Sequence, residues 1–411
     1  MKNGFLKKYF KGIVAKKLSD VEVTPRKSNQ HEFNARKGMR SLFGNDDRKF
    51  KTTFMYLNDE DKIVTEDYLT WYDARRNHPT RTEYRLYYPS NQVSNLASSG
   101  DSLFVCVKQD DTVLCIITQS DATITAQLYW LFDIDSKQAD CFIENSELST
   151  DGNQLEYIVK TILDQIGIEY KYQDDDYLLN GLMLKFGMSF PKTDIFSEYA
   201  RSLVPDVSPQ EDPDRALIKW YEQEEKLFFL MEQQLIKEKL KQGFCFNNEV
   251  NVDDFIKFSL SVQNRRKSRA GLSFENHISA LFDANHITYS HTPVTENRSR
   301  PDYVFPNIEC YHNPKNIENF LTVLGAKSTC KDRWRQVLAE ADRVKRKHLI
   351  TLEAAISEYQ TDEMNNKSLQ LVVPKQIHKT YTDRQRKQLY TVADFIEEVK
   401  YKQNFYNQYI K

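Results

Sequence analysis

Long apolar runs, paired cysteines and an excess of charge of one sign are all missing from this sequence. No apolar stretch approaches the roughly 18 residues of a membrane-spanning helix, so we expect no membrane partner. The N-terminal segment MKNGFLKKYFKG is basic but lacks the apolar core of a signal peptide, and we therefore expect a cytoplasmic protein.

The cysteines are few and scattered, which excludes two classes of small stabilised domain. The six of them, at positions 106, 115, 141, 245, 310 and 330, form no CxxC pair. This spacing argues against a structural zinc site and against a secreted disulfide framework. Reduced thiols inside a cell are the better interpretation.

The charge balance excludes a uniformly basic nucleic-acid-binding protein, because the net charge is only -2 over 411 residues. Basic charge is instead local: residues 326–347 hold eight Lys or Arg against three Asp or Glu. With 40% hydrophobic and 28% charged residues the composition is that of a globular protein, and the length favours two domains.

The first half of the chain has strand-like patterns. SLFVCV and TVLCIIT, joined by KQDD, are typical of a hairpin, and RTEYRLYYP (81–89) alternates as a strand does. SLVPDVSPQEDPDR (202–215), with three prolines and four acidic residues, is typical of a linker. We therefore predict a β-rich N-terminal domain over residues 1–200, a linker over 201–214 and a C-terminal domain over 215–411.

The C-terminal part alternates between helical and extended patterns. Apolar residues at helical spacing occur over 215–242, from about Ser273 and over 331–346. Between and after them lie the extended segments ITYSHTPV, PDYVFPN, FLTVLGAKST, HLITL and LQLVVP. This order predicts an α/β fold with a central mixed sheet flanked by helices.

Acidic residues and one lysine gather at the ends of these segments. Asp302 opens one expected strand and Lys327 ends the next, so pairing of the strands would bring them together, with Glu340 in the helix behind and Glu275 on the preceding helix. Carboxylates beside a lysine suit Mg²⁺-assisted phosphodiester cleavage, because hard cations take oxygen ligands and polarise phosphoryl groups. An ordinary surface ion pair is the alternative.

Two basic segments offer contacts to DNA. Lys331, Asp332 and Arg333 directly follow the strand of Lys327, and such residues can hydrogen-bond guanine and cytosine edges in the major groove. The segment NRRKSR (264–269) suits phosphate contacts that carry no sequence information, through Arg265, Arg266, Lys267 and Arg269. A solvated helix start and a solvated charge run are the respective alternatives.

The blocks SVQNRRKSRAGLSFENH, RPDYVFPN and AKSTCKDRWRQVLAEAD resemble the catalytic domain of EcoRII-type restriction endonucleases, within the PD-(D/E)XK nuclease superfamily. The resemblance runs from about Leu227 to Tyr381. It implies that Asp302, Lys327 and Glu340 form the catalytic triad, with Asp302 and Glu340 as metal ligands. It further implies roles near the site for Glu275 and Tyr311, and it assigns Lys331, Asp332 and Arg333 to reading the CC/GG ends of a target.

The resemblance also has a departure and an extension. Relatives that flip the central base pair use an arginine and an aromatic residue, but the nearest positions here are Tyr221 and Glu225; we expect Trp220 and Tyr221 to pack in the core. Family members of this size carry an N-terminal B3-like barrel that binds DNA, with which the strand patterns of residues 80–135 are compatible.

Together these features predict a type II restriction endonuclease that makes Mg²⁺-dependent, sequence-specific double-strand breaks. We expect double-stranded DNA as substrate, a homodimer with two active sites, and a cognate DNA methyltransferase acting on the same site. Two alternatives stay open: a defence nuclease controlled by a ligand or another factor, and a non-cutting DNA-binding protein with this fold.

Overall fold

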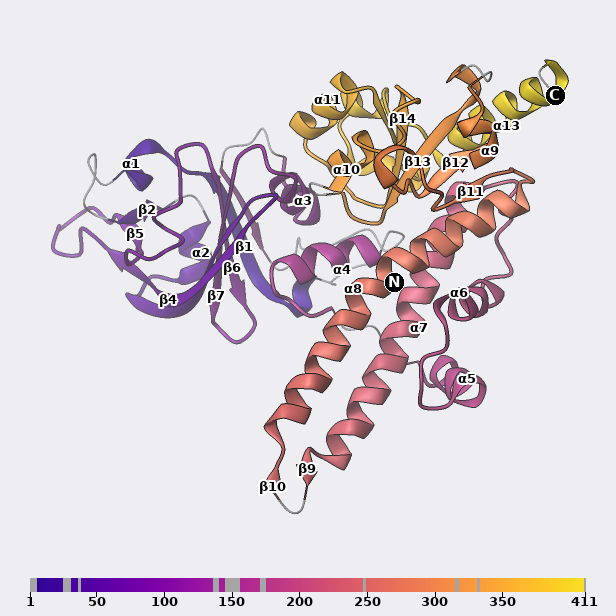
Figure 1. The fold of residues 1–411 in the computed structure, drawn as a ribbon. Helices are drawn as coiled ribbons and strands as arrows, with labels where there is room; N and C mark the ends of the chain where they lie inside the picture. Colours follow the sequence, from indigo (N-terminus) through magenta and orange to yellow (C-terminus); the bar gives the residue numbers. More distant parts are fainter. Residues whose placement is uncertain are drawn as a thin grey trace. The chain divides into compact units, whose positions relative to one another are not determined.

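The computed structural model describes residues 6–24, 31–35, 38–135, 140–144, 156–170, 175–246, 249–314, 318–330 and 333–409. It divides into two compact units (Figure 1). Unit 1 comprises Met1–Gln154, Val159–Ile168 and Ala355–Gln360, and unit 2 comprises Leu155–Ile158, Glu169–Ala354 and Thr361–Lys411. Within the described residues, none of the helices is long and apolar enough to cross a membrane.

Unit 1 is built on a large sheet, which in its described part has eight strands in the order β2-β5-β4-β3-β7-β6-β1-β8. The strands are β1 (Phe10–Lys17), β2 (Glu32–Asn34), β3 (Arg48–Leu57), β4 (Lys62–Asp73), β5 (Tyr84–Tyr87), β6 (Ser102–Lys108), β7 (Val113–Thr118) and β8 (Asp140–Glu144). The helices α1 (Asp20–Val23), α2 (Met39–Phe43) and α3 (Thr123–Leu131) accompany them, and α4 (Glu156–Gln165) is shared between the two units. The predicted hairpin of β6 and β7 and the predicted strand β5 are confirmed.

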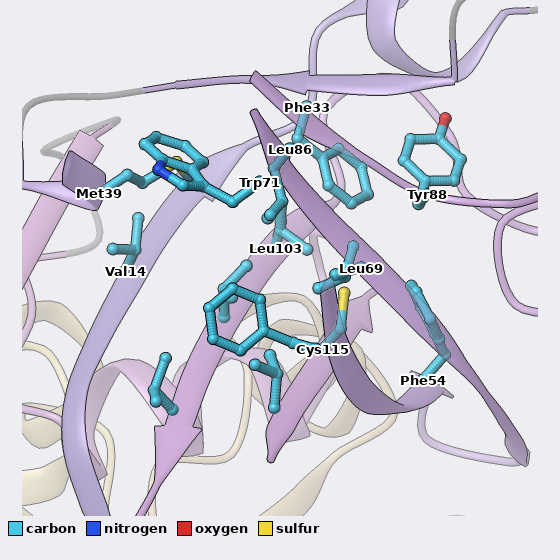
Figure 2. Close-up of a cluster of buried hydrophobic side chains, with 14 of the residues drawn as sticks. Val14, Phe33, Met39, Phe54, Leu69, Trp71, Leu86, Tyr88, Leu103 and Cys115 are labelled. Atoms are coloured by element: carbon cyan, nitrogen blue, oxygen red, sulfur yellow. The ribbon is translucent and has the colours of Figure 1, made fainter. Parts of the chain in front are cut away.

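The core of unit 1 explains the strand pattern. Apolar side chains from strands far apart in sequence meet in one cluster, and Figure 2 shows Trp71, Leu86 and Leu103 within it, together with Met39 of α2. The Trp71 indole is fully buried and donates to the carbonyl of Gly44 at 3.1 Å, so its polar atom is satisfied. A β-rich N-terminal part is thus confirmed, whereas a B3-like form stays a prediction.

Unit 2 has a mixed sheet in the order β11-β12-β13-β14-β15 across its described residues. These strands are β11 (Ser290–His291), β12 (Tyr303–Phe305), β13 (Thr322–Lys327), β14 (Lys347–Thr351) and β15 (Leu369–Val372). The first three pair antiparallel and the last three pair parallel. The helices are α5 (Asp176–Phe186), α6 (Thr193–Ser202), α7 (Pro213–Gln242), α8 (Val252–Ala284), α9 (Ile308–His312), α10 (Trp334–Leu338), α11 (Glu358–Asn366), α12 (Asp383–Arg386) and α13 (Val392–Tyr409). The predicted α/β architecture is confirmed.

Helices α7 and α8 run side by side as a long antiparallel pair, closed at one end by β9 (Cys245–Phe246) and β10 (Glu249–Val250) (Figure 1). The predicted helix over 215–242 is confirmed. Helix α8, however, begins at Val252 and not near Ser273. The NRRKSR segment therefore lies inside this helix, because Asn251 caps its N-terminus by accepting from Asp254 N.

The proline-rich segment 201–214 leads directly into α7. Pro213 occupies the first turn of α7, and the Asp212 side chain caps it by accepting from Arg215 N. Chain segments before and after 201–214 share one core, in which Leu182, Phe196 and Ala200 pack with seven-residue neighbours Leu227 and its surroundings on α7. The expectation of few contacts across this segment is therefore wrong, because α5 and α6 bury apolar side chains against α7.

The helix expected over 331–346 is short. Helix α10 ends at Leu338, and Ala341 has a positive φ of 51°, which a continuous helix does not allow. Tertiary hydrogen bonds hold the chain in this turn, since Arg343 N donates to the Tyr311 hydroxyl at 3.3 Å and the Arg343 guanidinium donates to the carbonyl of Asn313. Glu340 consequently lies in a turn and not on a helix.

Candidate active site

The pairing of β12 with β13 brings Asp302 and Lys327 together. In this antiparallel pair Tyr303 is opposite Leu324, so the residue before β12 lies beside the last residues of β13. The Asp302 Oδ2 atom accepts from Lys327 Nζ at 2.7 Å and from the backbone N–H of Ala326 at 2.6 Å. The juxtaposition predicted from the sequence is what the strand register produces.

A glycine in β13 lets the next helix pack closely over this strand. A Cβ atom on Gly325 would lie 2.4 Å from the Val337 side chain, which is buried on α10. Only glycine therefore allows α10 to lie against β13 at this distance. The turn that carries Glu340 follows directly from α10.

Glu340 shares the electrostatic environment of this pair. Burial, and after it the negative charge of Asp302, raise the pKa of Glu340 to about 7, although Lys327 and Lys347 act in the opposite direction. Its Oε2 atom is buried and has no hydrogen-bond partner among the residues that the structure describes. The carboxylate is thus short of positive charge.

These donors fit a hard divalent cation. A Mg²⁺ ion requires oxygen ligands and is held in proteins by one or two carboxylates together with water. Asp302 and Glu340 supply two carboxylates, and the partnerless buried oxygen of Glu340 is a ligand atom that a cation would satisfy. The described residues contain no group of three or more His, Cys, Asp or Glu arranged to hold a metal, so the protein would supply only part of the coordination shell.

Lys347, the first residue of β14, is a neighbour of Glu340 that sequence reasoning missed. Its side chain is buried, and its Nζ donates to the carbonyl of Leu338 at 2.6 Å. Burial lowers the pKa of Lys347, while Asp342, Glu340 and Glu296 raise it. A lysine at a strand start gives no sequence signal of burial, because only the return of β14 beside β13 encloses it.

Glu275 lies on α8 beside the β11–β12 edge of the sheet. Its Oε2 atom is 3.0 Å from Nε2 of His291, and its backbone carbonyl accepts from the buried Tyr303 hydroxyl at 2.7 Å. Tyr303 adjoins Asp302 in the chain, and the charges of Glu275 and Asp302 both act on its phenol. The structure therefore places Glu275 near the same end of the sheet.

Tyr311 is fully buried on α9, and its hydroxyl donates to Glu296 Oε2 at 2.6 Å. Burial and the Glu296 carboxylate raise the pKa of the Tyr311 phenol. The same hydroxyl accepts from Arg343 N, so Tyr311 contacts the turn that follows Glu340. The structure shows no hydrogen bond from Tyr311 to Asp302 or Lys327 and gives it a supporting position instead.

Lys331 and Asp332 lie outside the described residues, but the residues around them form a tight turn. Arg333 N donates to the Cys330 carbonyl at 2.8 Å, and the Arg333 guanidinium donates to the Thr329 carbonyl at 2.9 Å. Glu353, a buried residue that the sequence did not single out, accepts from Cys330 N at 2.9 Å. Arg333 itself is exposed.

The NRRKSR segment is used largely within the helix pair. Arg269 is buried, and its guanidinium lies 3.1 Å from Glu224 and 2.7 Å from Glu225 on α7. Arg266 pairs with the buried Glu232 at 2.6 Å. In this structure Arg269 therefore holds two helices together and is not on an open phosphate-binding surface, because buried carboxylates require a nearby cation.

The positions of the base-flipping residues of relatives are occupied by core side chains. Trp220 and Tyr221 are both buried, and the Tyr221 ring packs edge-on against Phe274 of α8 with centroids 6.0 Å apart. Glu225 is engaged by Arg269. The expectation that Trp220 and Tyr221 pack in the core agrees with their burial.

Comparison with known proteins agrees with the resemblance seen in the sequence. The family model described as EcoRII C terminal matches residues 228–396. These residues belong to the EcoRII C-terminal family. The matched range contains Asp302, Lys327, Glu340, Glu275 and Arg333.

A curated protein shares much of this sequence. The type II restriction enzyme EcoRII of Escherichia coli is 38% identical over 213 residues, which are 52% of this chain and 51% of that enzyme. The chain thus aligns with about half the length of this relative of the EcoRII C-terminal family.

Solved structures with limited similarity include a complex of the restriction endonuclease PspGI with substrate DNA. This likeness has a TM-score of 0.44 and 16% identity, and it covers 53% of this chain and 94% of that one. Metal-depleted Ecl18kI in complex with uncleaved, modified DNA has a TM-score of 0.46 and 16% identity, with coverage of 58% and 88%. No inference rests on either likeness.

Proposed function

We propose that this chain is a type II restriction endonuclease that makes Mg²⁺-dependent, sequence-specific double-strand breaks in DNA. The observation that carries the proposal is the Asp302–Lys327 pair at 2.7 Å with the buried, charge-deficient carboxylate of Glu340 beside it. This arrangement lies inside a domain of the EcoRII C-terminal family. The E. coli relative is named as a type II restriction enzyme.

In this proposal Asp302 and Glu340 hold the Mg²⁺ ion. When bound, the ion polarises a phosphoryl oxygen and lowers the pKa of water. Glu340 can retain a proton near neutral pH until a cation replaces it, since its pKa is raised to about 7.

Lys327 has a separate role in the proposal. Its ammonium is held by Asp302 Oδ2, and the same oxygen is also bonded by the Ala326 N–H, so the side chain is fixed at the end of β13. A fixed ammonium stabilises negative charge that develops on a phosphate, because its orientation needs no further rearrangement. Glu275 adds a nearby carboxylate, and Tyr311 positions the turn after Glu340.

Sequence recognition is assigned to the segment 328–333. Arg333, with Lys331 and Asp332, would read G·C pairs at the CC/GG ends of a target through major-groove hydrogen bonds. The buried Glu353 supports this assignment, because its bond to Cys330 N anchors the segment to the core. Of the NRRKSR segment, Arg265 and the exposed Arg266 and Lys267 are proposed phosphate contacts.

The proposed biological setting follows from cleavage of both strands. A palindromic or near-palindromic target needs two active sites related by a two-fold axis, so we propose a homodimer. A cognate DNA methyltransferase acting on the same site would protect the host DNA, and the enzyme would work in the cytoplasm.

Incubation of the full-length protein with plasmid DNA, with Mg²⁺ and with EDTA, tests the proposal. Discrete fragments that appear only with Mg²⁺ are expected, and sequencing of their ends gives the target. Mg²⁺-dependent cutting at random positions would refute the sequence-specific part. Binding to specific DNA without any cutting would instead support a DNA-binding protein with this fold, and cutting only after another factor is added would support a controlled defence nuclease.

A further inference from the structure

One side of α8 is covered by α7, and its opposite side forms a distinct surface. Val262 and Arg269 are buried against the helix pair. Leu260 and Lys267 come two residues before them, which is about 200° around the helix. Asp253 continues this row seven residues earlier. The row Asp253, Leu260 and Lys267 therefore points away from α7.

Apolar side chains line this outward surface. Val252, Ile256 and Leu260 follow one another at intervals of four residues, and they are 60%, 48% and 52% exposed. We call Val252, Asp253, Ile256, Leu260 and Lys267 the outer face of α8. An apolar stripe of this kind at the surface, bordered by charged residues, is typical of a contact surface for another protein.

The charges of the outer face are complementary to themselves. Asp253 lies seven residues before Leu260, and Lys267 lies seven residues after it. If two copies of α8 pack antiparallel about a two-fold axis at Leu260, each Asp253 comes opposite the Lys267 of the other copy, while the two Leu260 side chains meet at the axis. A contact of one surface with its own copy requires this symmetry.

Asp254 and Arg266 follow the same rule, because each lies six residues from Leu260. Helix pairs of this kind bury apolar side chains at the seam and place opposite charges along its edges. A groove of another protein would explain the apolar stripe, but it would not explain why the two charge signs are equidistant from its centre.

We propose that the outer face of α8 is a dimerisation surface, on which α8 of a second copy of this chain packs antiparallel about Leu260. This proposal deepens the homodimer proposed above by naming the surface that forms it. It also assigns Lys267 to the dimer contact in place of the phosphate contact expected from the sequence.

Sedimentation equilibrium of the full-length protein tests the surface. The parent chain is expected to dimerise, and Leu260→Asp should raise the dissociation constant at least about tenfold, because it buries two carboxylates at the axis. Ser261→Asp is the matched control, since it places the same charge about 100° around the helix. Equal weakening by both variants, or by neither, overturns the proposal.

Charge reversal tests the antiparallel register. Asp253→Lys and Lys267→Asp should each weaken the dimer several-fold, because each creates two like-charge contacts per dimer. The double variant should restore the dimer towards the parent affinity, since the opposite charges face each other again. Additive weakening in the double variant overturns the register.

Chemical crosslinking reads the axis directly. In a Cys245→Ser background, which removes an exposed cysteine, Leu260→Cys should give a covalent dimer with a short bismaleimide. Ser261→Cys should not. A chain that is monomeric at all concentrations, for example because another part of it covers α8, overturns the proposal, and so does a dimer whose Leu260→Cys variant does not crosslink.

These measurements do not involve DNA, so they are separate from the plasmid test. A dimer with the expected crosslink that cuts no DNA would refute the proposed nuclease and leave the surface intact. A sequence-specific nuclease whose oligomeric state ignores all these variants would refute the surface alone.

Discussion

The Asp302 carboxylate illustrates how single residues define the candidate site. One of its oxygens takes bonds from both the Ala326 N–H and the Lys327 ammonium, so the carboxylate orients the lysine and the strand end together. Charge-assisted hydrogen bonds of this kind are stronger than neutral ones. The geometry therefore survives without a bound cation.

Lys327→Ala and Asp302→Ala should each lower the cleavage rate at least about 100-fold, because each removes charge at the reacting phosphate. Specific DNA binding measured in Ca²⁺ should stay within about threefold of the parent, since a single removed contact of this kind is not a base contact. The exposed Lys387→Ala serves as the control. A Lys327→Ala or Asp302→Ala variant that cuts within about tenfold of the parent rate would show that the catalytic assignment is wrong.

Glu340 gives the metal-free protein a pH-dependent stability. Its pKa is raised from 4.5 to about 7, so the folded state binds this proton more tightly than the unfolded state does. Raising the pH from 4.5 to 7 therefore lowers the free energy of unfolding, and the loss is complete above pH 7.

Glu340→Gln removes this titration. In urea unfolding with EDTA, the variant should gain stability relative to the parent as the pH rises towards 7, and the gain should stay constant at higher pH. Added Ca²⁺ should stabilise the parent more than the variant. A stability difference that does not change with pH would contradict the raised pKa.

At the scale of single elements, the segment 328–333 is held at both ends. The Glu353 carboxylate fixes Cys330 N, and Thr329 holds the Arg333 guanidinium. If Arg333 reads guanine, Arg333→Ala should cost about 1–3 kcal/mol and relax discrimination at one G·C position.

Binding of a panel of singly substituted targets measures this. Arg335→Ala is a suitable control, because Arg335 pairs with Glu363 at 3.1 Å outside this segment. Uniform weakening across the panel by Arg333→Ala would show a phosphate contact and reject the reading role.

The turn after α10 depends on a hydrogen bond between elements. Tyr311→Phe removes the bond to Glu296 and the acceptor of Arg343 N. We expect a loss of about 1–3 kcal/mol in the free energy of unfolding, because a buried partner is left unsatisfied. The exposed Tyr359→Phe is the control. Unchanged stability in urea unfolding would contradict the supporting role.

At the scale of the whole molecule, the shared core of α5, α6 and α7 decides where the chain can be cut. A fragment that begins at Asp175 keeps Leu182 and Phe196 against α7, whereas one that begins at Val204 loses both. Each lost apolar side chain removes about 1.5–3 kcal/mol of burial.

The Asp175 fragment should therefore unfold at higher urea concentration than the Val204 fragment, and it should keep the cleavage specificity of the whole chain. Faster cutting by this fragment would indicate that the N-terminal part covers the site, and slower cutting would indicate that it supplies DNA affinity. Equal stability of the two fragments would favour the division at 201–214 that the sequence suggests.

The sequence by itself determined the order of helices and strands in the C-terminal part and the pairing of Asp302 with Lys327. Both follow from local patterns: apolar periodicity specifies the elements, and two adjacent antiparallel strands leave their ends side by side. Recognisable blocks in the sequence likewise indicated the EcoRII C-terminal family.

Only the tertiary structure decided the rest, because burial and partners depend on segments that are distant in the chain. The turn at Ala341 exists since Tyr311 and Arg343 bond across it, and helical periodicity could not show this. Arg269 looked like a surface cation until α7 supplied Glu224 and Glu225. Lys347 and Glu353 became visible as supporting residues only when the parallel strand β14 had brought them beside β13, since a charged residue in a sequence carries no mark of its burial.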